Sequence, residues 1–310
     1  MTPLLRSRRF RPFLTQLLKG IGQGVAAAAI PLILGVNPAS AATIYAADSF
    51  TDGVTGGVVG GGAFELYGLG YVQQGNDLFI GLNTNLPLGG FVDSTVTGGS
   101  IAWGDMFFNF APDLSFEAAL AAGSVYGVRF DAANDSGVPL GVYQVQATKS
   151  VVAENNGFLS LQAYLDRVHE AGGNPSMGAV IPLDGSYLSN TGLPQNEIAT
   201  GRWLGEVDFI EDFSTVGFGP DFGFSNALGQ TGDFTYGFRV DSAIMPTGSF
   251  VAHVLAECIN DGLGFRGELS EIAPRPQPED APSGQSVPEP SGLIGMAIAL
   301  GTFTILRSPR

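Results

Sequence analysis

The chain has 310 residues, with 29 acidic against 14 basic side chains and a formal net charge of −15. Five basic residues precede position 42 and two end the chain, so the body between them carries about −22. Such a charge repels nucleic acid and anionic membrane surfaces, and it attracts divalent cations or basic partners. The single Cys258 excludes an intramolecular disulfide.

The first 41 residues predict a secretory signal peptide. Basic residues between Arg6 and Lys19 precede an apolar stretch at 21–36. Ala39-Ser40-Ala41 has the small-x-small pattern of a cleavage site, which places the start of the mature chain at Ala42. Signal peptidase is therefore an expected processing partner, and we expect the chain to be exported.

Residues 42–272 predict a single β-rich extracytoplasmic domain. Short apolar runs rich in β-branched and aromatic residues alternate with glycine-rich turns. Strands are expected at 42–46, 77–82, 125–130, 141–147, 203–210, 233–240 and 250–258. The segment 131–137 is expected to be the loop between two of them.

Two short helices are expected to pack on these strands. Residues 115–122 predict one helix, capped by Asp113 or Ser115. Apolar residues from Phe158 to Val168 recur at spacings of three and four, which predicts an amphipathic helix capped by Asn155 or Asn156. The predicted fold class is thus mainly β, a sandwich or jelly-roll-like domain with two short helices, flanked by the signal peptide and a C-terminal hydrophobic sorting helix.

Residues 273–286 predict a Pro-rich linker, and 287–310 predict a hydrophobic tail. Val287-Pro288-Glu289-Pro290 precedes a run without charge at 292–306, and Arg307 and Arg310 follow. A helix of these 15 residues would reach about 22 Å. Because a membrane span usually needs about 20 residues, the run is marginal as a permanent anchor and suits a transient stop. The two arginines favour the cytoplasmic side.

This order of Pro-Glu-Pro, apolar segment and basic end resembles the PEP-CTERM sorting signal of bacterial surface proteins. The resemblance implies that exosortase, a membrane-embedded transpeptidase, recognises and removes the tail. It implies transient contact with the inner membrane, as a membrane-associated precursor, and a mature form at the cell surface or outside the cell. A single-pass anchor that is never cut is the alternative.

The body also resembles cyanobacterial exosortase-dependent surface proteins. The resemblance rests on 105–110, 233–237, 250–254 and 257–261. The family pattern at the last segment is Glu-Cys-Gly-Asn-Asp, and Ile259 replaces the glycine here. The resemblance implies a β-rich exported domain and brings no catalytic residues with it.

His253, Glu257 and Cys258 are the first candidates for chemistry. On a strand, residues four apart share a face, so His253 and Glu257 are expected on one partly exposed face and Cys258 on the other. That separation argues against a Cys-His dyad and favours a buried, inert thiol. His169 is the other histidine, and two histidines give little support for zinc.

We predict no cofactor, with calcium as the open alternative. The candidate ligands form two groups, at Asp131, Asn134 and Asp135 and at Asn260 and Asp261. Calcium prefers such oxygen ligands, but neither group has the spacing of an EF-hand loop. Ordinary turn chemistry explains them as well.

A hydrolase would need two carboxylates in a cleft. The acidic cluster Glu206, Asp208, Glu211 and Asp212 could supply them, with Glu206 and Asp208 on one strand face. A solvated strand edge explains the cluster equally well, and no catalytic motif accompanies it.

The leading hypothesis is a non-enzymatic exported protein with a structural or adhesive role, in contact with the cell surface or extracellular polysaccharide. The second is a carbohydrate- or calcium-binding module, suggested by Trp103 and Trp203 as exposed aromatics and by the acidic loops. The third is an extracellular hydrolase.

Overall fold

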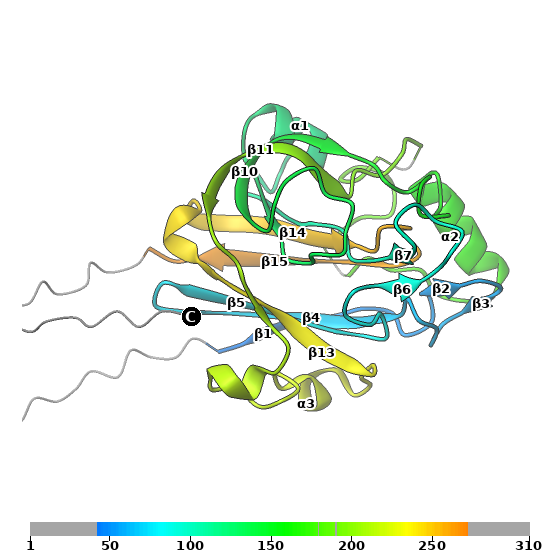
Figure 1. Cartoon of the computed structure of the whole chain (residues 1–310), viewed down its shortest axis with the longest axis horizontal. Helices are drawn as coiled ribbons and strands as arrows, with labels where there is room; N and C mark the ends of the chain where they lie inside the picture. The colour runs from blue at the N-terminus through cyan, green and yellow to red at the C-terminus, as the bar shows by residue number, and fades with distance from the viewer. Residues whose placement is uncertain (1–41, 179, 190, 272–310) are drawn as a thin grey trace, which may run out of the picture. The chain divides into compact units, whose positions relative to one another are not determined.

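The structure is a computed structural model that describes residues 42–178, 180–189 and 191–271. Two antiparallel sheets dominate it (Figure 1). The first contains β1 (Ile44–Ala47), β4 (Leu66–Gln74), β5 (Asp77–Thr84), β13 (Phe234–Asp241) and β12 (Asp208–Ile210), in this order. The second contains β11 (Glu197–Gly205), β10 (Gly141–Lys149), β9 (Val125–Arg129), β8 (Met106–Asn109), β14 (Gly248–Leu255) and β15 (Gly262–Leu269).

Two small hairpins and three α-helices complete the described part. The hairpins are β2 (Val54–Thr55) with β3 (Val58–Val59) and β6 (Phe91–Val92) with β7 (Ser100–Ile101). The helices are α1 (Phe116–Ala121), α2 (Leu161–Glu170) and α3 (Phe224–Leu228), with 3-10 turns at Phe213–Val216 and Ser242–Ile244. The predicted mainly β fold is confirmed. None of the described helices is long and apolar enough to cross a membrane.

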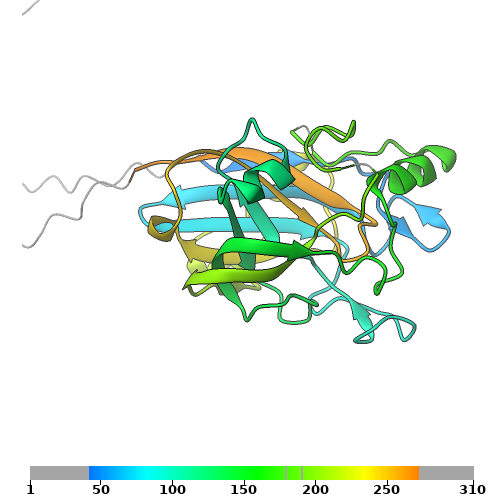
Figure 2. The same ribbon diagram turned by 90° about the horizontal axis from the view of Figure 1, so that it is seen from above.

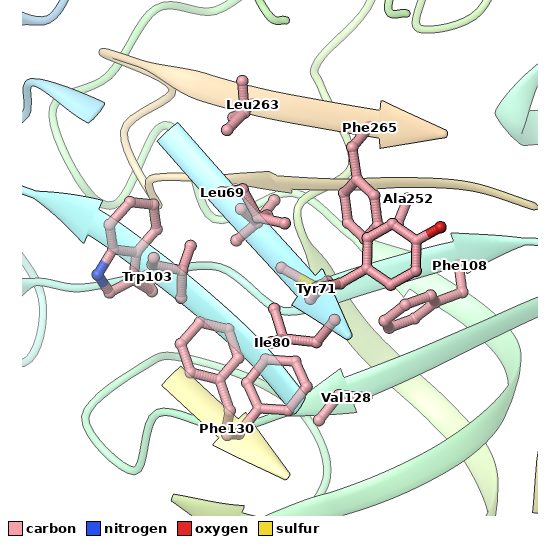
Figure 3. Packing of buried hydrophobic residues seen from close by; sticks show 14 of the residues in the cluster. Leu69, Tyr71, Ile80, Trp103, Phe108, Val128, Phe130, Ala252, Leu263 and Phe265 are labelled. Atoms are coloured by element: carbon pink, nitrogen blue, oxygen red, sulfur yellow. The ribbon is translucent and has the colours of Figure 1, made fainter. Parts of the chain in front are cut away.

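The main core lies between the two sheets. Leu69, Tyr71 and Ile80 come from the five-stranded sheet and meet side chains of the six-stranded sheet (Figure 3). The opposing side chains are Phe108, Val128, Ala252, Leu263 and Phe265. Apolar residues at every second position face this layer. Of the strands that carry these side chains, β5, β9 and β14 were predicted, and β4, β8 and β15 were not.

Trp103 belongs to this core, and the prediction that it is exposed was wrong. Only 2% of its surface is accessible. Its indole N–H donates to the Tyr236 hydroxyl at 2.7 Å, and that hydroxyl donates to the carbonyl of Leu86. Burial of the large indole is stabilising because its polar group keeps a partner.

A second core lies on the other face of the six-stranded sheet, under α1 and α2. Phe107, Tyr143 and Val251 point to it from the strands, and Leu161 and Tyr164 from α2. The α2 N-cap is Ser160, whose hydroxyl accepts from the N–H of Ala163 at 3.1 Å.

The expected caps Asn155 and Asn156 serve other bonds. Asn155 donates to Val151 and Asp135, and Asn156 donates to Thr95. The Ser115 cap of α1 is confirmed.

The strand prediction failed where tertiary packing decides. The expected strand 203–210 is two strands in different sheets, because β11 ends at Gly205 and β12 begins at Asp208. β14 ends at Leu255, before Glu257. β4 was not predicted, since Gly68 and Gly70 interrupt its pattern. A methyl group at Gly68 would lie 2.6 Å from Leu228 of α3. The two glycines therefore leave room on the outer face of the five-stranded sheet for the aromatic cluster around Phe222 and Phe224.

Candidate functional site

Four buried carboxyl groups gather where ends of strands from both sheets meet. Asp48 follows β1, Asp52 precedes β2, Glu65 precedes β4 and Asp261 precedes β15. Carboxylate oxygens of Asp48, Asp52 and Asp261 lie within 4.8 Å of one another, close enough to hold one metal ion. Asp48 is 8% exposed and the other three at most 1%. We call these four residues the carboxyl centre.

The local sequence explains how Glu65 is held. The Gly-rich segment 53–62 folds around it, and the N–H groups of Gly53 and Gly61 donate to its Oε2 at 3.0 and 2.8 Å. A Cβ at Gly53 would lie 2.5 Å from the Cα of Glu65, so this approach requires glycine.

Backbone N–H groups fix one oxygen of Asp48, one of Asp52 and both of Asp261, whose Oδ1 accepts from Gly262 at 2.7 Å. Gly178 donates to Oδ1 of Asp48 at 3.2 Å, and Ser176 donates to Oδ2 of Asp52 at 2.6 Å. Asp261 accepts from Leu66 at 2.8 Å, which ties the entry of β15 to the start of β4.

The α2 helix closes the centre from the side. Figures 1 and 2 show α2 beside the β2–β3 hairpin, and Arg167 of α2 donates to the carbonyl of Gly57 at 2.8 Å. Tyr164 of the same helix is fully buried, and its hydroxyl lies beside Asp52. Burial, together with the nearby carboxylates, raises the pKa of this phenol.

Burial makes charge costly in this centre. It raises the pKa of Asp48 to about 7. Burial and then the charge of Asp48 raise the pKa of Asp52 to about 9. The pKa of Asp261 is raised by burial and by Asp48, and burial raises the pKa of Glu65. Burial and mutual repulsion therefore disfavour the charged forms of these carboxyl groups in the folded state.

A second buried acidic group lies around Asp105. Oδ2 of Asp105 accepts from the N–H of Ile198 and the hydroxyl of Ser136, both at 2.7 Å. Glu197 lies beside Asp105, and burial followed by this charge raises the pKa of Glu197 well above its usual range. The two oxygens of Glu257 accept from Ala102 and from Asp135, both at 2.6 Å. These bonds tie loop 131–137 to both β11 and the segment after β14.

The residues predicted as calcium ligands do not lie together in the structure. Asn134 donates to Asp105 at 3.0 Å, and Asp131 accepts from the N–H of Ala133 within its own turn. Asn260 donates to the carbonyl of Val54 at 2.8 Å. Only Asp261 enters the carboxyl centre. Asp48, Asp52 and Glu65 were not predicted, although each stands beside a glycine-rich or strand-end turn.

His253 is buried, so the predicted partly exposed face was wrong. The rings of Phe107, Phe116 and Tyr187 surround it, and the Tyr187 hydroxyl is 3.3 Å from Nδ1. Burial lowers the pKa of His253 to about 3, so the imidazole is neutral.

Glu257 lies after the end of β14 and does not share the surroundings of His253, since it accepts hydrogen bonds from Ala102 and Asp135. Cys258 is buried as predicted, and burial raises its pKa to about 12, which leaves the thiol unreactive.

The hydrolase candidates line shallow surface hollows beside β12. Glu206 lies between β11 and β12, so it does not share a strand face with Asp208 as predicted. A hollow of about 330 Å³ includes Glu206, Asp208 and Arg239. Arg239 donates two bonds to Asp208, and Asp212 caps the following 3-10 turn. Glu211 lies in an adjoining hollow.

The processing residues lie mostly outside the described residues. These are Ala39 and Ala41 at the predicted cleavage site, and Val287, Pro288, Glu289, Pro290, Arg307 and Arg310 in the tail. Ala42 is described and exposed. No protein-family model, curated protein or solved structure matches the chain.

Proposed function

We propose that the chain is an exported, exosortase-processed surface protein whose β-sandwich has a structural or adhesive role without catalysis. The observation that carries the proposal is the order of Val287-Pro288-Glu289-Pro290, an apolar run, and Arg307 and Arg310. The predicted signal peptide supplies an independent argument for export. β1 begins at Ile44 and β15 ends at Leu269, so these strands lie between the two signals in sequence.

The described side chains support a non-catalytic role. The thiol of Cys258 is fully buried, and His253 is enclosed by aromatic rings. Asp208, an exposed hydrolase candidate, is paired with Arg239. Catalysis needs a nucleophile or acid within reach of both a base and a substrate, and these residues do not supply that arrangement.

The adhesive part of the proposal points to extracellular polysaccharide. Trp203 lies on β11, an edge strand of the six-stranded sheet, and is 55% exposed. An exposed indole offers a flat apolar face beside a polar ring edge, which suits stacking on a sugar ring.

Intact mass and fractionation of the protein from its own host test the sorting proposal. We expect wild-type protein to end near Pro290 and to leave the inner membrane. Replacing Pro288, Glu289 and Pro290 by alanines should leave the tail in place and the protein in the membrane. The control replaces Pro276, Gln277 and Pro278 in the linker and should be processed normally. Wild-type protein that keeps Arg310 and stays in the membrane would overturn the proposal.

A further inference from the structure

We propose that the carboxyl centre is a calcium site that joins the two sheets. Its ligands would come from Asp48, Asp52, Glu65, Asp261 and the hydroxyl of Tyr164. The site goes beyond the proposed sorting function and does not depend on it. It also differs from the sites expected from sequence, since Asp261 is its one predicted member.

The first argument is the state of the carboxylate oxygens. Oδ2 of Asp48, Oδ1 of Asp52 and Oε1 of Glu65 are buried and have no hydrogen-bond partner in the described part of the chain. The other oxygen of each carboxylate is fixed by a backbone N–H. Buried polar atoms are nearly always partnered, so the free oxygens of Asp48 and Asp52, with that of neighbouring Glu65, call for a ligand.

The second argument comes from Tyr164, which is not acidic and reaches the centre from a different element. Its hydroxyl is buried beside Asp52 and close to Asp48 and Asp261, and it has no hydrogen bond of normal geometry among the described residues. A buried tyrosine hydroxyl usually finds a partner. A cation could be coordinated by this hydroxyl oxygen together with the three free carboxylate oxygens.

The third argument is charge. The ion pairs within the described residues are those of Arg239 with Asp77 and Asp208, so no described basic side chain neutralises the centre. Like charges at this separation repel strongly when buried. Protons are one way to remove the repulsion, and a divalent cation is the other. A cation can bind the free oxygens and the tyrosine hydroxyl together, whereas each proton is shared between two groups at most.

The ligand chemistry selects calcium. The donors are all hard oxygens, whereas zinc prefers nitrogen and sulfur. Magnesium usually keeps several waters and is held by one or two carboxylates. Calcium takes six to eight oxygens and accepts carboxylates in one- or two-oxygen modes, which fits a buried site with four carboxyl groups. A bound ion would connect β1, β4 and α2 to the entry of β15.

Calcium titration of the full chain, stripped with a chelator, tests the proposal. We expect one calcium ion per chain by elemental analysis and equilibrium dialysis, with weaker retention of magnesium and zinc. At calcium near 100 Kd, the melting temperature should rise by about 5–10 °C, since binding to the folded state alone stabilises it. No bound calcium and no shift would overturn the proposal.

Charge-removing variants make the test specific. In chelator, Asp52→Asn should melt at or above the wild-type temperature, because it removes one of the acidic groups that repel one another in the carboxyl centre. When calcium is added, the melting temperature of this variant should increase much less than that of the wild type. Glu65→Gln gives a second variant with the same expectation. The matched control, Asp105→Asn, changes the other buried acidic group and should keep the full calcium-induced rise. A full rise in both Asp52→Asn and Glu65→Gln would overturn the proposal.

Terbium luminescence gives a readout that does not depend on stability. Terbium ions replace calcium at oxygen sites, and a tyrosine ligand transfers excitation to them. We expect bound terbium to emit on excitation of the wild-type protein, to be displaced by calcium, and to lose most of this emission in Tyr164→Phe. Unchanged emission in Tyr164→Phe would place the ion elsewhere and overturn the assignment.

Discussion

Asp48 and Asp261 stand at opposite ends of the described domain in sequence, and their buried carboxylate oxygens lie within 4.8 Å of each other. Asp48 follows the first strand of one sheet, and Asp261 precedes the last strand of the other. The two carboxylates therefore meet between the sheets at the entry of β15, the strand that leads toward the predicted linker and tail. Because buried like charges repel, a proton or a cation between them should stabilise the domain here.

Gly53→Ala should destabilise the folded state by about 1–3 kcal/mol, the usual cost of overpacking. The added Cβ would lie 2.5 Å from the Cα and 2.7 Å from Oε2 of Glu65, so backbone as well as side chain would have to shift. Urea unfolding measures the change. Gly57→Ala is the matched control, because nothing lies within 4 Å of its Cβ position. Equal stability of the two variants would contradict the close approach.

Ile259→Gly should also lower stability, despite the glycine in the family pattern at this position. Ile259 has a φ of 47°, a costly conformation for a β-branched residue, yet its side chain is fully buried. Glycine would relieve about 1–2 kcal/mol of backbone strain. Loss of the buried side chain costs about 2–5 kcal/mol, so packing should prevail.

Urea unfolding of Ile259→Gly and Ile259→Ala separates the two effects. The alanine variant loses the packing and keeps the backbone strain, so it should be the less stable of the two. A glycine variant more stable than wild type would show that strain prevails.

Glu257→Gln should flatten part of the pH dependence of stability. Burial raises the pKa of Glu257 from 4.5 to about 7, so its charged form is disfavoured in the folded state. The stabilisation from this group is complete below pH 4.5 and is lost as pH rises toward 7, by about 3 kcal/mol in all. Unfolding in chelator at several pH values measures it, with the exposed Glu117→Gln as control. Parallel pH profiles for wild type and Glu257→Gln would contradict the prediction.

Trp203→Ala should weaken binding to extracellular polysaccharide from the host while changing stability by about 1 kcal/mol or less. The indole is 55% exposed, so truncation removes the stacking surface more than core packing. Co-sedimentation with the polysaccharide measures binding. Phe234→Ala, at an exposed aromatic on β13, is the control and should bind normally. Unchanged binding of Trp203→Ala would remove this residue from the adhesive surface.

Local sequence patterns were enough to predict the mainly β fold and several local features. Alternating residues in 125–130 and 141–147 predicted β9 and β10, which pair as the hairpin around loop 131–137. Ser115 was one of two residues predicted to cap the first helix, and Cys258 was predicted to be a buried thiol. These features follow from local patterns, because period-two burial and capping depend on residues close in the chain.

Which distant residues meet depended on tertiary packing. This packing divided 203–210 between two sheets, placed Gly68 and Gly70 in β4 beneath an aromatic layer, and buried Trp103 and His253. It also brought Asp48, Asp52 and Glu65 to Asp261. A local pattern reports whether a residue faces a core, but not which strand lies opposite, since sheet order is set by packing between distant segments.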